Sequence, residues 1–216
     1  MLMIVGAGMF DGHGAQASAS SGHAGAAPTR FHPLSPATGG AAAGLKRSAL
    51  RPAGTCRPVT AGSGYVNPVA GDVLIGERID QGVDYAGTGT LTAIGAAKIT
   101  YVGTSDTGWP GAFVEYRLLD GPDVGCFVYY AEGINPANGL HAGQTVRAGQ
   151  VMANIIPGWS TGIELGWGAG KNTKTYAAKT GKWSATDDAD SVASGAGKSF
   201  SALIASLGGP RGKVEG

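Results

Sequence analysis

Apolar and polar residues alternate in short runs from Tyr65 to Trp167, and turn residues separate these runs every 8 to 12 positions or so. Such spacing is typical of an all-β sandwich or barrel. No segment of useful length in this region has a helical period. We therefore predict a mainly β domain with strands at residues 72–75, 82–86, 90–94, 97–102, 112–118, 125–131, 145–146, 151–156 and 162–167.

Residues 143–151 (GQTVRAGQV) contain two Gly-Gln pairs six positions apart, with valines between and after them. Glycine permits the positive φ angles that tight turns need. The segment predicts a strand–turn–strand hairpin.

The last part of the chain changes character after Trp167. Residues 168–197 are polar and rich in glycine, which is typical of a linker. Residues 198–207 (KSFSALIASL) then repeat apolar side chains at helical spacing. Gly208, Gly209 and Pro210 follow as a stop signal. We expect a short C-terminal packing helix.

Residues 1–64 have a different composition from the rest. They are dominated by glycine, alanine, serine and proline and cannot bury enough apolar surface to order themselves. The expected organisation is a disordered extension at 1–64, a β domain at 65–168, and a polar linker with a C-terminal helix at 169–216. Residues 1–17 resemble a signal peptide, because an apolar start precedes the cleavage-like segment Ala15-Gln16-Ala17. The resemblance is degenerate, because no basic residues stand before the apolar segment.

Charge and cysteine usage narrow the function classes. Residues 65–168 hold ten acidic and four basic residues, whereas both flanks are basic. An acidic core argues against nucleic-acid binding, which needs a basic patch. No run of 18 apolar residues predicts a membrane span. Cys56 and Cys126 are the two cysteines, and the sequence leaves open whether they form a disulfide.

Five segments of the β region occur in a recognisable order. They are Asp80-Gln81-Gly82-Val83-Asp84, residues 89–99 (GTLTAIGAAKI), Tyr130-Ala131-Glu132-Gly133, residues 146–151 (VRAGQV) and residues 161–166 (TGIELG). Together they resemble the lysostaphin-type (LytM-type) zinc metallopeptidases, which cut peptide cross-links in bacterial cell walls. The resemblance extends over about 100 residues. It implies a lysostaphin-like β domain of the duplicated hybrid motif fold.

This sequence departs from the family's pattern at the positions of the zinc ligands. Asp80 matches a ligand histidine, Asp84 the ligand aspartate, and Glu132 the catalytic histidine of the Tyr-x-His segment. Glu164 and Gly166 match the final His-x-His pair. Zinc sites normally use nitrogen or sulfur donors. We therefore expect no zinc site here, with calcium as the alternative ion for Asp and Glu oxygens.

These residues predict a secreted or wall-associated domain that acts on or binds peptidoglycan. We expect it to lack zinc peptidase activity and thus to be a pseudoenzyme. The cell-wall glycan or peptide would be its partner. Two alternatives stay open: a carboxylate-based, glycosidase-like hydrolase, and a structural module of a wall or virion assembly. The predicted catalytic residues are Asp80, Asp84, Glu132 and Glu164, and the predicted ligand-binding aromatics are Tyr85, Trp109, Tyr130, Trp159 and Trp167.

Overall fold

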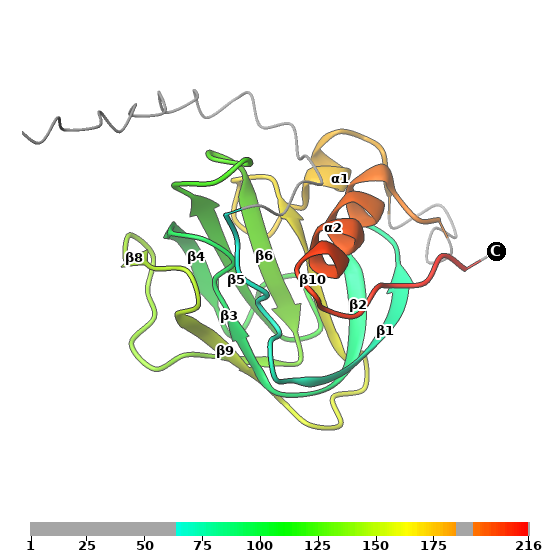
Figure 1. The fold of residues 1–216 in the computed structure, drawn as a ribbon, viewed down its shortest axis with the longest axis horizontal. Helices are drawn as coiled ribbons and strands as arrows, with labels where there is room; N and C mark the ends of the chain where they lie inside the picture. The colour runs from blue at the N-terminus through cyan, green and yellow to red at the C-terminus, as the bar shows by residue number, and fades with distance from the viewer. Residues whose placement is uncertain (1–63, 185–191, 216) are drawn as a thin grey trace, which may run out of the picture. The chain divides into compact units, whose positions relative to one another are not determined.

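The computed structural model describes residues 64–184 and 192–215, and it is mainly β, as predicted. The predicted disorder of 1–64, the signal-like segment at 1–17 and Cys56 lie outside the described residues, apart from Gly64. The elements (Figure 1) are β1 (Val73–Ile79), β2 (Val83–Thr88), β3 (Thr90–Thr92), β4 (Ala97–Gly103), β5 (Ala112–Leu118), β6 (Phe127–Glu132), β7 (Ile134–Pro136), β8 (Thr145–Val146), β9 (Val151–Ile155), β10 (Ile163–Gly168), α1 (Tyr176–Lys179) and α2 (Gly195–Ser206).

The strands form two antiparallel sheets. The larger sheet has seven strands in the order β1-β2-β10-β6-β5-β4-β8, and the smaller has the order β3-β9-β7. The predicted hairpin at 143–151 is wrong, because β8 pairs with β4 while β9 pairs with β3 and β7. The segment instead turns a corner from one sheet to the other.

Alternation along the strands separates the two faces of the larger sheet. One face packs with the smaller sheet and α2 into the main core, where Tyr116, Tyr130, Leu165, Trp167 and Phe200 are fully buried. Helix α2 contacts β10 and β2 on this face (Figure 1). The opposite face therefore carries the alternate residues, and these build the candidate site.

A smaller apolar cluster lies on the opposite face. Phe113 and Tyr129 stack with ring centroids 5.3 Å apart, and Trp109 packs on both rings. The Trp109 indole also donates a hydrogen bond to the Thr173 carbonyl at 3.1 Å. This cluster ties the loop after β4 to the loop after β10.

The predicted C-terminal helix is present as α2. Ser194 is its N-cap and accepts a hydrogen bond from the Gly197 backbone amide at 3.0 Å. The chain then runs beside the edge strand β1, where Lys213 pairs with Arg78 in a parallel bridge. The C-terminal segment thus extends the larger sheet next to the candidate site.

Cys126 is buried just before β6 and takes part in a disulfide bond. No described cysteine is a free thiol. Of the two alternatives left open by the sequence, the bonded one holds for Cys126. Within the described residues, neither helix is long and apolar enough to cross a membrane.

Candidate functional site

Three of the four predicted carboxylates converge on the face of the larger sheet that lies opposite the main core. Asp80 begins the turn after β1, Asp84 lies on β2, and Glu164 lies opposite Asp84 in the β2–β10 register. One carboxylate oxygen of each lies within 4.8 Å of the others. All three residues are buried, with exposed fractions of 3%, 8% and 2%. We call Asp80, Asp84 and Glu164 the acidic cluster.

The turn at residues 80–82 holds the first of these carboxylates in place. The Gly82 amide donates to the Asp80 carboxylate at 3.1 Å, and the Ser194 amide donates to the Asp80 carbonyl at 2.8 Å. Glycine is needed at position 82, because a Cβ there would collide with the Tyr129 hydroxyl and the Glu164 carboxylate. The turn is therefore fitted to the acidic cluster on one side and to α2 on the other.

Glu132 reaches the same face by a strained backbone. It follows Val128 and Tyr130 in the strand alternation, so a regular strand would turn its side chain into the core. Its φ of 75° places it in the left-handed region, which is uncommon for a non-glycine residue. The side chain instead lines the groove beside the acidic cluster. Such strain often marks functional sites.

Tyr129 occupies the space where a side chain at position 166 would extend. It lies opposite Gly166 in the β6–β10 register and donates a short hydrogen bond from its hydroxyl to Glu164. A Cβ at Gly166 would lie 2.7 Å from that hydroxyl. The sequence alone does not predict this role, although Tyr129 directly precedes the segment Tyr130-Ala131-Glu132.

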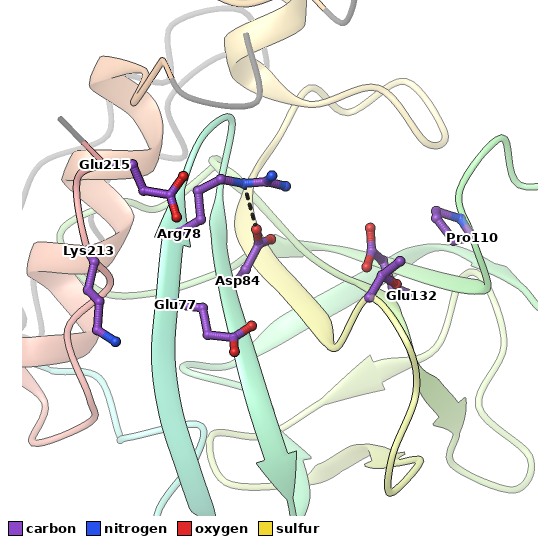
Figure 2. Close-up of a pocket in the computed structure, with 8 residues that line it drawn as sticks. Glu77, Arg78, Asp84, Pro110, Glu132, Lys213 and Glu215 are labelled. Atoms are coloured by element: carbon purple, nitrogen blue, oxygen red, sulfur yellow. Dashed lines mark ion pairs between the residues drawn. The ribbon is translucent and has the colours of Figure 1, made fainter. Parts of the chain in front are cut away.

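Arg78 supplies a positive charge that sequence reasoning also missed. Its Nε lies 3.0 Å from an Asp84 oxygen and one Nη lies 3.5 Å from an Asp80 oxygen. Figure 2 shows the guanidinium reaching over Asp84 from β1. Two of the three acidic-cluster carboxylates are therefore ion-paired within the chain.

Burial dominates the ionisation of the site. Desolvation raises the pKa of Asp84 to about 7, with Asp80 adding repulsion, and these effects outweigh the attraction of Arg78. Burial, then repulsion from Asp80 and Asp84, holds the pKa of Glu164 well above its usual range. Burial also raises the pKa of Glu132, against a hydrogen bond from Thr161. Burial therefore favours the protonated forms of Asp84, Glu132 and Glu164.

A groove runs over these residues. Its central cavity of about 640 Å³ is lined by Glu77, Arg78, Asp84, Pro110, Glu132, Thr161, Lys213 and Glu215 (Figure 2). A cavity of about 390 Å³ shares Arg78, Pro110 and Glu132 with it and extends to Trp183. A third, of about 190 Å³, shares Glu77 and Thr161 and extends to Trp159. Because they share lining residues, the three cavities adjoin one another, and we call them together the groove.

The predicted aromatic contacts fall into two groups. Trp159, which is 36% exposed, and Trp109 line the groove. The structure does not support ligand contact by Trp167 and Tyr130, because both are fully buried in the core. Tyr85 borders the Trp159 cavity, but its ring is buried and its hydroxyl donates to the Pro210 carbonyl at 3.2 Å.

The residues present do not fit a zinc ion. The acidic cluster offers oxygen donors alone, whereas zinc sites in proteins rely on imidazole or thiolate ligands. Gly166 has no side chain, and Tyr129 fills the volume where one would extend. His141 is exposed, and its ring bonds the Ala142 carbonyl. Oxygen donors suit a hard cation such as Ca²⁺ better, but Arg78 already pairs with two of them.

No protein-family profile matches the chain, and no curated protein matches it. Solved structures similar to it include lysostaphin, at 20% identity with a TM-score of 0.38, covering 50% of this chain and 48% of that one. The catalytic domain of the prophage-encoded EnpA of Enterococcus faecalis is 22% identical, with a TM-score of 0.38, covering 49% and 87%. A zinc-containing peptidase from Vibrio cholerae is 17% identical, with a TM-score of 0.30, covering 51% and 35%. The chain thus spans about half of the lysostaphin structure.

Proposed function

We propose that this domain binds bacterial cell-wall peptidoglycan in the groove and has no zinc-dependent peptidase activity. The five sequence segments that resemble the lysostaphin type support the choice of ligand. The observation that carries the second part is the Tyr129 ring packed over Gly166. The Tyr129 ring fills the space of a side chain at position 166, which matches the third ligand of the family. A histidine introduced at one of the other ligand positions would therefore not create a zinc centre.

The chemistry of the groove suits a polymer that carries both amines and carboxylates. Glu77, Asp84, Glu132 and Glu215 line the central cavity together with Arg78 and Lys213. Charge-assisted hydrogen bonds from such side chains recognise ammonium and carboxylate groups on a peptide. Trp159 at one end offers an aromatic surface for a sugar ring or an apolar side chain.

The same proposal places the protein outside the cytosol, secreted or associated with the wall. The disulfide at Cys126 supports this placement, because such bonds persist in oxidising compartments. The signal-like residues 1–17 point in the same direction.

A second candidate is a hydrolase that uses carboxylates alone. Glu132 and Glu164 line the same cavity, and both hold their protons more tightly than usual. A protonated carboxyl beside an ionisable one is the arrangement that acid–base cleavage of a glycosidic bond requires. The burial of Glu164 beneath Tyr129 favours the binding role over this one.

The test is co-sedimentation of the full-length chain with purified insoluble peptidoglycan, with and without a chelator. We expect the chain to sediment with the polymer in both conditions and to release neither new amino groups nor reducing sugar ends. Thr161→Phe should lower the apparent affinity about tenfold, because it fills the central groove. Thr145→Phe is the matched control, since Thr145 is exposed on the far edge strand β8.

Each other outcome has a clear meaning. Chelator-sensitive release of amino groups would refute the absence of zinc peptidase activity. Release of reducing ends that is lost in Glu132→Gln would favour the hydrolase. Equal loss of binding in both phenylalanine variants, or no binding by the wild type, would remove the groove as a peptidoglycan site.

A further inference from the structure

The acidic cluster lies beside a cation that belongs to the chain itself. Three buried carboxylates within 4.8 Å of one another repel each other strongly unless a positive charge or protons compensate them. Arg78 contacts two of the three, at 3.0 Å and 3.5 Å. Its side chain is one-third exposed, so it approaches the cluster from the groove side.

The C-terminal segment fixes the backbone on both sides of Arg78. The Lys213 amide donates to the Glu77 carbonyl at 2.5 Å, and the Ile79 amide donates to the Lys213 carbonyl at 2.8 Å. These two bonds make the parallel bridge centred on Arg78. The pairing of β1 with β2 is irregular between Gly76 and Ile79, so the C-terminal segment supplies bonds that β2 does not.

Further contacts anchor this segment to the domain. The Gly212 amide donates to the Ser201 hydroxyl of α2 at 3.0 Å. The Pro210 carbonyl accepts the Tyr85 hydroxyl at 3.2 Å. The chain packs so closely on β1 that a Cβ at Gly76 would collide with the Arg211 carbonyl. The position of Arg78 is thus set by residues more than 130 positions later in the sequence.

We propose that Arg78 is the resident cation of the acidic cluster, held there by residues 210–215, and that it excludes divalent metal ions from Asp80, Asp84 and Glu164. A guanidinium cannot be deprotonated in a protein, so Arg78 remains a cation beside Asp80 and Asp84. Removing Arg78 takes away the guanidinium that forms ion pairs with the carboxylates of Asp84 and Asp80. Hard cations bind such oxygen sets, so the loss of Arg78 creates a Ca²⁺ or Mn²⁺ site. Peptidoglycan binding plays no part in this role, so the two proposals fail separately.

The test compares Ca²⁺ and Mn²⁺ binding by calorimetry in the full-length wild type, Arg78→Gln and Arg147→Gln. Arg147 is exposed in the turn after β8, so its variant has the same charge change away from the site. We expect Arg78→Gln to bind about tenfold or more tightly than the wild type, and Arg147→Gln to match the wild type. Adding Asp84→Asn to Arg78→Gln should abolish the gain.

A second readout comes from terbium luminescence excited through tyrosine. Tyr129 contacts Glu164, so an ion in the acidic cluster of Arg78→Gln should show sensitised emission that Ca²⁺ displaces. Gly76→Ala should show part of the gain, because it pushes the C-terminal segment away from β1. Unchanged cation affinity in Gly76→Ala would overturn the role of residues 210–215.

Two results would overturn the role of Arg78 itself. One is equal cation affinity in wild type and Arg78→Gln. The other is a thermal-unfolding result. If Arg78→Gln unfolds at a lower temperature than the wild type, the proposal expects added Ca²⁺ or Mn²⁺ to raise its melting temperature more than that of Arg147→Gln. A variant that is destabilised and gains nothing from either ion contradicts a latent cation site.

Discussion

Gly166 and Tyr129 face each other on β10 and β6, and the phenol of Tyr129 fills the volume that a side chain at position 166 would need. The hydroxyl then reaches Glu164 and satisfies a buried carboxyl that would otherwise lack a donor. The two residues therefore act as a pair. A glycine at 166 is required by the tyrosine at 129.

This pairing predicts a thermodynamic coupling. Gly166→Ala should lower the free energy of unfolding by about 1–3 kcal/mol in the wild type, because the new Cβ meets the Tyr129 ring at 2.7 Å. In a Tyr129→Leu background the same substitution should be close to neutral, since the far end of the ring is gone. Denaturant unfolding of the four proteins of this double-mutant cycle measures the coupling. An equal cost in both backgrounds would contradict it.

The sequence could predict three members of the site but not their two neighbours. Asp80, Asp84 and Glu164 occupy positions in a spaced motif, so their convergence follows from the strand pairing that the motif implies. Arg78 meets them only because the distant C-terminal segment sets its backbone. Tyr129 reaches Glu164 diagonally over a glycine, which depends on register and packing rather than on residue type.

At the scale of elements, alternation and turn residues predicted most strands of the larger sheet. The short strand β7 and the four-residue helix α1 lack any such period and were not predicted. The spacing of the Gly-Gln repeat predicts a hairpin. Each glutamine instead accepts a bond from the backbone amide three residues earlier, at His141 and at Arg147. The repeat is thus two similar turns that lead into different sheets.

Helix α2 supports the candidate site through its first turn. Gly197 lies so close to the turn at residues 80–82 that a Cβ would be 2.6 Å from the Asp80 and Gly82 carbonyls. Gly195 belongs to the same turn of the helix, but a Cβ there meets nothing within 4 Å. Both glycines have the same low helix propensity, but only the one at position 197 lies where a side chain would collide with a neighbour.

We accordingly expect the same substitution to have opposite effects at these two positions. Gly195→Ala should raise the unfolding free energy by about 0.5–1 kcal/mol, because alanine favours the helix. Gly197→Ala should lower it by about 1–3 kcal/mol, since α2 or the 80–82 turn must move. Thermal or denaturant unfolding checks both. A stabilising Gly197→Ala would mean that α2 does not press on the turn of Asp80.

At the scale of the whole molecule, several buried carboxyls share one direction of pKa change. Burial is the main cause at Asp84, Glu115, Glu132 and Glu164, and it raises all four. These four carboxyls therefore bind more protons in the folded protein than in the unfolded chain, and for Asp84 and Glu115 the difference extends from about pH 4 to about pH 7. Their contribution to stability is complete at lower pH and is lost as the pH rises through the folded-state values. Stability should consequently fall between mildly acidic and neutral pH.

Glu115 allows the effect of burial on stability to be measured at a carboxyl that does not line the groove. Burial raises its pKa to about 7, against hydrogen bonds from the Thr100 hydroxyl at 2.8 Å and the Gly170 amide at 2.9 Å, and against the attraction of Lys179. Glu115→Gln keeps the shape and removes the charge. At pH 8 the variant should unfold with a free energy up to about 3 kcal/mol higher than the wild type. Near pH 4 the advantage should vanish, because Glu115 is then protonated in both states.

Denaturant unfolding across this pH range measures the difference, with Asp106→Asn as the control at an exposed loop position. If Glu115→Gln is less stable than the wild type at pH 8, the ionised carboxylate must be stabilising, and its bonds to Thr100 and Gly170 outweigh burial. If its advantage is constant with pH, the pKa of Glu115 is the same in the folded and unfolded states, and the fall in stability must come from other carboxyls such as Asp84 and Glu164.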